Sequence, residues 1–279
     1  EVVTQGAWAS GGNLTTARDK ARGFGIQTAA ALVGGETPSG SPPVTVDTEE
    51  YDGTNWTAGG DYPAAYTGIG TFGTLTAGVG FGGYAPPGYV NTTNEYDGSS
   101  WTAGNNYPAS LNSAGTCGTL TAGLGIGGDG YPASPRYLVI TRHYDGTNWT
   151  NGGDLGAGHY LGTGAGTQTA AALVGGQTRT SSTEVYDGSS WTAGGAPLVA
   201  TSSHASTQAG TQDAFLVMGT PDTDFVQKYD GTSFATSPSL TTGRTACTGA
   251  GTATAGLCAG GRTPPFTQAT EEFTGETTA

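Results

Sequence analysis

The sequence predicts an all-β fold, a six-bladed β-propeller in which each blade has four antiparallel strands. The main observation behind this prediction is a repeat: the string Tyr-Asp-Gly-x-x-Trp-Thr, exact or weakened, occurs six times along the 279 residues. Its copies begin at Tyr51, Tyr96, Tyr144, Tyr186 and Tyr229, with a faint sixth at Phe273. A period of about 40 to 50 residues is typical of propellers, in which each repeat is one blade.

A second marker keeps step with the first, because an apolar run ending in two glycines precedes most copies. These pairs are Gly34-Gly35, Gly82-Gly83, Gly127-Gly128, Gly175-Gly176 and Gly260-Gly261. The composition agrees with β-structure: 51 residues are Gly and only 11% are charged, so the strong helix formers are scarce. The 5 Trp, 13 Tyr and 8 Phe supply apolar surface that disordered chains lack.

The four strands of the first repeat can be placed in order. The first strand lies at about residues 22–27, the second at 29–33 and the third at 49–51. Asp52-Gly53 then forms a hairpin turn, because Gly tolerates the positive φ that such turns require. The fourth strand begins at Trp56. Four antiparallel strands in each repeat are typical of a propeller blade.

The two ends of the chain are expected to share one blade. The last repeat lacks a Trp-bearing fourth strand, while Trp8 and the residues after it align with Trp56 and the residues after it. Residues 1–14 should therefore complete the sixth blade, which otherwise spans about residues 240–279. Such closure removes the open strand edges that invite aggregation. We expect residues 1–279 to form a single domain.

The Gly-Gly pair, the Tyr of the third strand and the Trp of the fourth resemble the kelch motif of β-propellers over essentially the whole chain. Arg18 and Arg244 are similar to the Arg that often precedes the first strand of a kelch blade, although the intermediate repeats lack it. The regularity of the repeats also resembles kelch-like virion proteins of marine tailed phages, such as tail-fibre or adhesion proteins. This likeness implies a virion-surface or extracellular location. Kelch propellers include enzymes, cytoskeletal binders and adaptors, so the fold does not give the function.

The charge balance argues against two classes of partner. The net charge is −13 and the only lysines are Lys20 and Lys228, whereas nucleic-acid binding depends on clustered basic residues. No apolar stretch approaches the roughly 18 residues of a membrane helix, so we expect no membrane insertion. Because residue 1 is Glu, we expect a processed product or a piece of a longer chain.

Metal chemistry would have to use the three histidines. Some kelch-like propellers are copper radical oxidases, which need two His, two Tyr and a Cys crosslinked to one Tyr. His143 directly precedes a repeat Tyr and should lie away from the axis, while His159 and His204 precede the first strands of neighbouring blades. Most acidic residues are assigned to the repeat turns, namely Asp52, Asp97, Asp145, Asp187 and Asp230. We therefore expect no catalytic residue, metal or cofactor, and keep a copper oxidase or hydrolase as the alternative.

Cys247 and Cys258 raise the question of a disulfide. If the first hairpin of the last blade is centred between Thr252 and Ala253, the two cysteines lie directly opposite each other, and the geometry allows a disulfide. A shift of one residue would place them on opposite faces of the sheet. Two buried free thiols are the alternative.

Strand parity separates the two faces of the disc. The loops that join the second strand to the third, and the fourth strand to the next blade, all emerge on one face. They vary from blade to blade and carry aromatic residues, whereas the turns of the other face are near copies. Unless these aromatic residues pack over neighbouring blades, they indicate recognition. The candidate binding residues are Tyr84, Tyr89, Tyr131, Tyr137, Phe225, Phe266, His159 and His204.

These observations favour a non-enzymatic recognition or adhesion module, on a virion or otherwise extracellular, that contacts a glycan or a protein surface. Because an acidic chain gains little from attraction to anionic glycans, we expect aromatic stacking on neutral sugars or apolar burial to carry the affinity. A purely structural virion component, attached to other virion proteins, is the further alternative.

Overall fold

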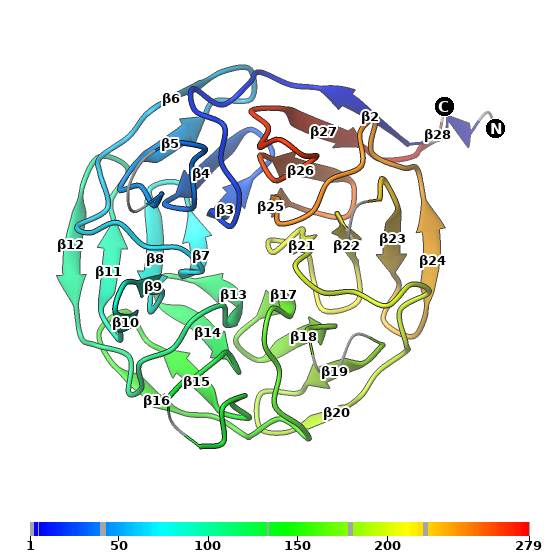
Figure 1. The fold of residues 1–279 in the computed structure, drawn as a ribbon. Coiled ribbons are helices and arrows are strands. Elements are labelled where there is room, and N and C mark those ends of the chain that lie inside the picture. Colours follow the sequence, from blue (N-terminus) through cyan, green and yellow to red (C-terminus); the bar gives the residue numbers. More distant parts are fainter. Residues whose placement is uncertain are drawn as a thin grey trace.

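The computed structural model describes residues 3–4, 6–39, 43–132, 134–177, 181–219 and 223–278. Six four-stranded antiparallel sheets stand around one axis, as Figure 1 shows. The described residues form strands, turns and loops, with no helix among them. The predicted all-β, six-bladed propeller is confirmed.

The blades follow one another in chain order, and each begins with an innermost strand at the axis and ends with an outermost one. In that order, blade 1 contains β3 (Arg22–Ile26), β4 (Ala29–Val33), β5 (Thr48–Tyr51) and β6 (Trp56–Ala58), and blade 2 contains β7 (Gly70–Thr74), β8 (Ala77–Phe81), β11 (Thr93–Tyr96) and β12 (Trp101–Gly104). Blade 3 contains β13 (Gly115–Thr119), β14 (Ala122–Ile126), β15 (Thr141–Tyr144) and β16 (Trp149–Asn151), and blade 4 contains β17 (Thr163–Thr167), β18 (Ala170–Val174), β19 (Thr183–Tyr186) and β20 (Trp191–Ala193). Blade 5 contains β21 (Ala205–Ser206), β22 (Phe215–Met218), β23 (Val226–Tyr229) and β24 (Phe234–Ser237), and blade 6 contains β25 (Thr248–Gly251), β26 (Ala255–Ala259), β27 (Thr270–Thr274) and β2 (Ala7–Ser10).

The sixth blade joins the two ends of the chain, as predicted. Strand β2 pairs with β27, and this register places Trp8 opposite Phe273. A further short pair, β1 (Val3–Thr4) with β28 (Thr277–Thr278), continues the contact beyond the blade. Figure 1 shows the N- and C-terminal ends side by side outside blade 6. The ring is therefore closed by hydrogen bonds between the first and last parts of the sequence.

The repeated turns of one face have structural roles. In blade 1, Asp52 Oδ1 accepts hydrogen bonds from the backbone N–H groups of Thr54 and Asn55, both at 2.7 Å, and Gly53 has φ 90°. The other turn of the same face carries a glutamine in three blades. Its Nε2 atom donates to two backbone carbonyls of the preceding blade, as in Gln27, Gln168 and Gln212. The aspartates therefore stabilise the turns and the glutamines connect neighbouring blades by hydrogen bonds, which explains why both kinds of turn are repeated.

The outer part of each blade is tied to its neighbour by two kinds of side-chain contact. The hydroxyl of the repeat Tyr donates to an acidic residue of the preceding blade, as Tyr96 does to Glu50 and Tyr144 to Glu95. For Tyr186 of blade 4, the partner on the preceding blade is His143 and not an acidic residue: His143 Nε2 lies 2.9 Å from Tyr186 Oη. His143 therefore lies on a third strand, away from the axis, as predicted. The indole N–H of the repeat Trp donates to a Thr of the preceding blade at 2.8–3.0 Å, as in Trp56, Trp101, Trp149 and Trp191.

The hairpin of the last blade has a different register from the expected one. Gly249, and not Cys247, lies directly opposite Cys258, so the strand pairing is shifted by two residues from the expected one, which keeps both cysteines on the same face of the sheet. Cys247 and Cys258 are both buried free thiols. Cys247 lies two residues before Gly249, and the two cysteines contribute to one apolar cluster. The expected direct cross-strand opposition of the cysteines is therefore wrong.

Candidate functional site

Six residues in the left-handed backbone conformation form a ring around the axis. Each blade supplies one, two residues before its innermost strand, with φ between 52° and 63°. They are Lys20, Gly68, Ser113, Leu161, Ser203 and Ala246. Five of the six carry a side chain, and a non-Gly residue rarely adopts this conformation, so the surrounding fold must hold the turn in place. Such local strain is often found at functional sites.

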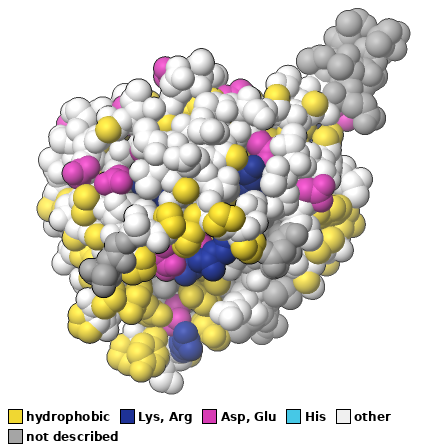
Figure 2. Space-filling view, turned by 45° about the horizontal axis from the view of Figure 1, so that its top comes forward, with side chains coloured by type: hydrophobic (Ala, Val, Ile, Leu, Met, Phe, Trp, Pro, Cys, Tyr) yellow, Lys and Arg dark blue, Asp and Glu magenta, His cyan; other side chains and the backbone are white. Residues whose placement is uncertain are grey.

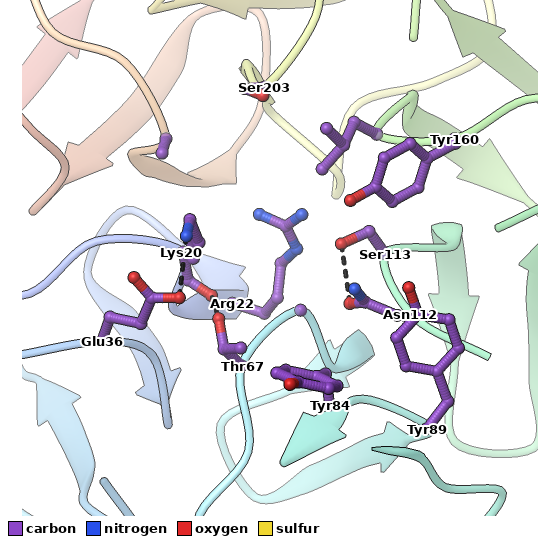
Figure 3. A pocket seen from close by; sticks show the side chains of 13 residues that line it. Lys20, Arg22, Glu36, Thr67, Tyr84, Tyr89, Asn112, Ser113, Tyr160 and Ser203 are labelled. Atoms are coloured by element: carbon purple, nitrogen blue, oxygen red, sulfur yellow. Dashed lines mark hydrogen bonds and ion pairs between the residues drawn. The ribbon is translucent and has the colours of Figure 1, made fainter. Parts of the chain in front are cut away.

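All six of these residues line one cavity of about 300 Å³. This cavity is the mouth of the central channel. It opens on the face that is in front in Figure 1, where the loops leading to the innermost strands cross the disc. Its wall also includes Arg22, Glu36, Thr67, Tyr84, Tyr89, Asn112 and Tyr160, which Figure 3 shows around the opening. The volume lies at the lower end of the roughly 300–1,000 Å³ of small-molecule sites.

Arg22 reaches into this mouth from the innermost strand of blade 1. It is the first residue of β3, and the first residues of the other innermost strands are all small: Gly70, Gly115, Thr163, Ala205 and Thr248. A long side chain therefore enters the axis from one blade only and finds space there. Figure 3 shows its guanidinium in the middle of the cavity, facing Tyr160 and Ser113.

Beneath Arg22 the channel is obstructed by blade 5. Its innermost strand, β21, has only two residues, and the segment that follows carries Gln208 into the axis. In the amide orientation that suits its neighbours, Gln208 Nε2 donates to Gly23 O at 3.3 Å and to Thr71 O at 3.1 Å, on blades 1 and 2. Two cavities that Gln208 lines among the described residues measure about 20 Å³ each. The mouth is therefore a cup with Arg22 near its floor.

Three tyrosine rings form part of the cup's wall and are held by neighbouring rings. Tyr84 and Tyr89 meet edge to face at 5.7 Å, within the hairpin of β9 (Tyr84–Ala85) and β10 (Gly88–Tyr89). Tyr160 stacks on Tyr137 at 5.7 Å with 12° between the ring planes. The Tyr89 hydroxyl donates to the buried carboxylate of Asp129 at 3.0 Å. The rings are therefore prepositioned to contact a ligand.

The polar groups of the cup carry a local excess of positive charge. Lys20 Nζ pairs with Glu36 Oε1 at 2.7 Å, so these two charges offset each other. Ser113 Oγ donates to Asn112 Oδ1 at 2.9 Å. Arg22 adds one further cation, and burial lowers its pKa. The cup is thus basic within a chain of net charge −13.

Of the six aromatic residues expected to bind on this face, three form or support the cup and three lie outside it. Tyr84 and Tyr89 line the cup, and Tyr137 supports it by stacking on Tyr160. Tyr131 lies outside it with 61% of its surface exposed, beside a separate shallow hollow lined by Pro132 and Leu138. The remaining two, Phe225 and Phe266, are partly buried and do not line the cup. Arg262 lies over the Phe266 ring, 4.7 Å from its centroid.

His159 and His204, both expected among the binding residues of the loop face, are buried and do not line the cup. His159 Nδ1 lies 2.8 Å from Gly175 O and Nε2 lies 3.0 Å from Glu184 Oε1. Arg18 makes the same pair of contacts in blade 1, to Gly34 O and Glu49. His159 thus replaces the structural Arg of blades 1 and 6.

The second histidine, His204, lies beside Arg22 below the cup, and burial lowers its pKa to about 3. Its ring is therefore neutral at physiological pH.

Sequence reasoning missed Arg22, Lys20, Tyr160 and the polar residues Asn112 and Ser113 of the cup. The signal for Arg22 was a departure from the repeat, since the first strand of every blade otherwise begins with a small residue. Tyr160 carried no such signal, because the residues at the equivalent place in other repeats, such as Thr67 and Asn112, follow no common pattern from which it could depart.

Within the described ranges, no three His, Cys, Asp or Glu side chains gather where they could hold a metal ion. In the same part of the chain, no helix has the length and apolar character needed to cross a membrane.

Comparisons with known proteins support the fold alone. No protein-family profile matches the sequence, and no curated protein matches it. Among solved structures, one titled "Structure of YjhT" superposes with a TM-score of 0.75 at 12% identity, over 92% of this chain and 95% of the other. At this identity the likeness concerns the six-bladed architecture.

Proposed function

We propose that this protein is a non-enzymatic recognition module that binds a terminal unit of a glycan in the cup at the mouth of its central channel. The observation that carries the proposal is the cup itself, closed below by Gln208 and walled by the rings of Tyr84, Tyr89 and Tyr160. A concave site of about 300 Å³ suits a compact ligand better than a flat protein surface. Tyrosine rings offer stacking surface together with a polar edge.

The distribution of side chains around the cup supports recognition on this face. Figure 2 shows Lys and Arg side chains together with hydrophobic and acidic ones near the middle of the tilted face, and further acidic side chains towards its periphery. The opposite face consists of turns whose Asp and Gln side chains are engaged in structural hydrogen bonds. A rigid ring with one variable face is the arrangement on which binding loops are usually carried.

The biological setting is part of the same proposal. The repeat pattern resembles kelch repeats, and the buried Arg18–Glu49 and Arg244–Glu271 pairs hold the Gly-Gly corners of blades 1 and 6. We propose a kelch-like adhesion propeller that works outside the cell or on a virion surface, where a glycan would be its receptor.

A glycan array tests the proposal with three forms of the protein. The wild-type chain should bind a discrete set of glycans, and Tyr84→Ala should weaken that binding at least tenfold because it removes one wall of the cup. The matched control is Tyr131→Ala, which removes a more exposed ring of the same face that lies outside the cup and meets its wall only at Tyr89, with ring centroids 6.5 Å apart, so binding should fall far less than in Tyr84→Ala. Loss of binding in Tyr131→Ala with retention in Tyr84→Ala would move the site away from the channel and refute the proposal.

A further inference from the structure

The guanidinium of Arg22 has no partner among the described residues, since neither a carboxylate nor a carbonyl oxygen of that part of the chain accepts from it. It lies partly buried between the cup and the deeper channel. A cation removed from water and left unpaired costs free energy, which an ion pair or a set of hydrogen bonds normally offsets. Arg22 is therefore a side chain whose position the folded protein does not explain.

The other arginines of the described residues show what a structural role looks like in this fold. Each donates to an oxygen of the protein, as Arg18 and Arg244 do from full burial. On the loop face, Arg136 holds the buried Asp129 at 2.8 Å and Arg262 holds the buried Asp19 at 3.0 Å. Arg22 differs from these arginines in that no oxygen of the described residues accepts a hydrogen bond from it, which leaves its guanidinium available to a ligand.

The surroundings of Arg22 also fit an anion. The Tyr160 hydroxyl faces the guanidinium from one side of the cavity, where it can donate to an anion, and Lys20 lies on the other side. The Ser113 hydroxyl lies beside Tyr160 and already donates to Asn112. The carboxylate of the wall, Glu36, is neutralised by Lys20. Five guanidinium N–H groups can bind a planar or tetrahedral oxyanion through two parallel hydrogen bonds.

We propose that the ligand of this cup carries one anionic group, a carboxylate or a sulfate, which Arg22 binds near the floor while the tyrosine rings hold the sugar to which it is attached. This inference rests on the proposed function and narrows its ligand to acidic glycans. It reverses the expectation of neutral sugars, because the overall negative charge of the chain does not extend into the cup. The single unpaired cation, Arg22, would be balanced by the single negative charge of the ligand.

Three sugars of equal ring structure separate the sources of that charge: glucuronic acid, glucose 6-sulfate and glucose, each titrated calorimetrically into the full chain. At least one of the two acidic sugars should bind ten or more times tighter than glucose, and the better of them identifies the group. Arg22→Met should abolish this preference while leaving any glucose binding unchanged. Lys228→Met, which removes an exposed positive charge on β23 of blade 5, should keep it.

A measurement without sugar checks that Arg22 has no structural role. The melting temperature of Arg22→Met should equal or exceed that of the wild type, because an unpaired cation is replaced by an apolar chain of similar length. A clear fall in melting temperature would show a structural role for Arg22 and overturn the inference.

The binding results distinguish failure of the inference from failure of the proposed function. If glycans bind in the cup, as judged by Tyr84→Ala, but acidic and neutral sugars bind equally and Arg22→Met has no effect, the anionic ligand is refuted and the recognition module stands. If Tyr84→Ala and Arg22→Met both leave glycan binding intact, both proposals are wrong.

Discussion

At the scale of single residues, the contacts between blades depend on hydroxyl groups that reach a neighbouring blade. Tyr96 donates to Glu50, and the burial of this hydroxyl, together with the carboxylate beside it, raises the Tyr96 pKa to about 12. Trp101 adds a hydrogen bond from its indole N–H to Thr48 at 3.0 Å. These bonds explain why the repeat retains Tyr and Trp rather than any large apolar residue.

Removing one such hydroxyl should therefore loosen the ring. We expect Tyr96→Phe to lower the free energy of unfolding by about 1.5–3 kcal/mol, the range for a hydrogen bond to a charged group. The control is Tyr229→Phe, because both hydroxyls accept from a backbone N–H of the preceding blade, but Tyr229 donates to Gly231 O within its own blade, at 3.0 Å, and not to a carboxylate. Urea denaturation measures both variants, and equal losses would contradict an interblade role for the Tyr96 hydroxyl.

The turn aspartates make stability depend on acid. Hydrogen bonds from the following backbone N–H groups and serines lower the pKa of Asp97 from 3.8 to about 2, and they lower that of Asp187 as well. A carboxyl with a lower pKa in the folded state contributes stability above its unfolded pKa and loses it as the pH falls through the folded value. We therefore expect unfolding free energy to decline between about pH 4 and pH 2.

The double variant Asp97→Asn with Asp187→Asn isolates this effect. Asn keeps the acceptor oxygen of the turn but does not titrate, so the decline should be shallower than in the wild type. Urea midpoints at pH 4.5, 3 and 2 give the comparison. Parallel curves for the two proteins would assign the acid sensitivity to other carboxylates.

At the scale of elements, β2 closes the molecule. Trp8 on this strand packs against Phe273 with ring centroids 5.2 Å apart, and its indole N–H donates to Pro238 O at 2.9 Å. Its side chain is buried against β27 of the last repeat. Without β2 the outer edge of β27 would be unpaired.

Truncation and substitution of this strand should both be costly. Trp8→Ala is expected to lower the unfolding free energy by roughly 3–5 kcal/mol, the usual loss for a buried Trp. Trp8→Phe should cost less, because Phe234 occupies the equivalent place in blade 5. Deleting residues 1–14 should lower the melting temperature more than either substitution, and a change of only one or two degrees would contradict the role of β2.

At the scale of the whole molecule, the two faces divide structure from binding. The face of the repeated turns joins neighbouring blades through glutamine side chains, while the opposite face carries loops that differ in every blade. The channel between them is open as a cup at the loop face and obstructed by Gln208 below. The quasi-symmetric ring is broken at two points, Arg22 in blade 1 and Gln208 in blade 5, and both meet at the axis.

The six-bladed architecture follows from patterns in the amino-acid sequence. The period of the Tyr-Asp-Gly-x-x-Trp string, the Gly-Gly pairs and the alignment of Trp8 with Trp56 predicted six blades and closure through the N-terminal strand. These features are local patterns that repeat, and each specifies a strand or turn through nearby residues alone. Strand parity also placed Tyr84 and Tyr89 on the face that contains the cup.

Which side chains meet at the axis depends on the packing of the six blades and cannot be read from the repeats. Arg22 reaches the cup because the first residues of five other innermost strands are small, and these residues are far apart in sequence. His159 is buried because its two ring nitrogens lie within hydrogen-bond distance of the Gly175 carbonyl and of Glu184. These two groups correspond to the partners of Arg18 in blade 1. The cysteine register differed because a hairpin centre is set by the turn geometry of Thr252 and Ala255, whose backbones hydrogen-bond at 2.9 Å, and composition does not reveal it. Contacts across the axis arise from ring closure, so no pattern within a single repeat could have shown them.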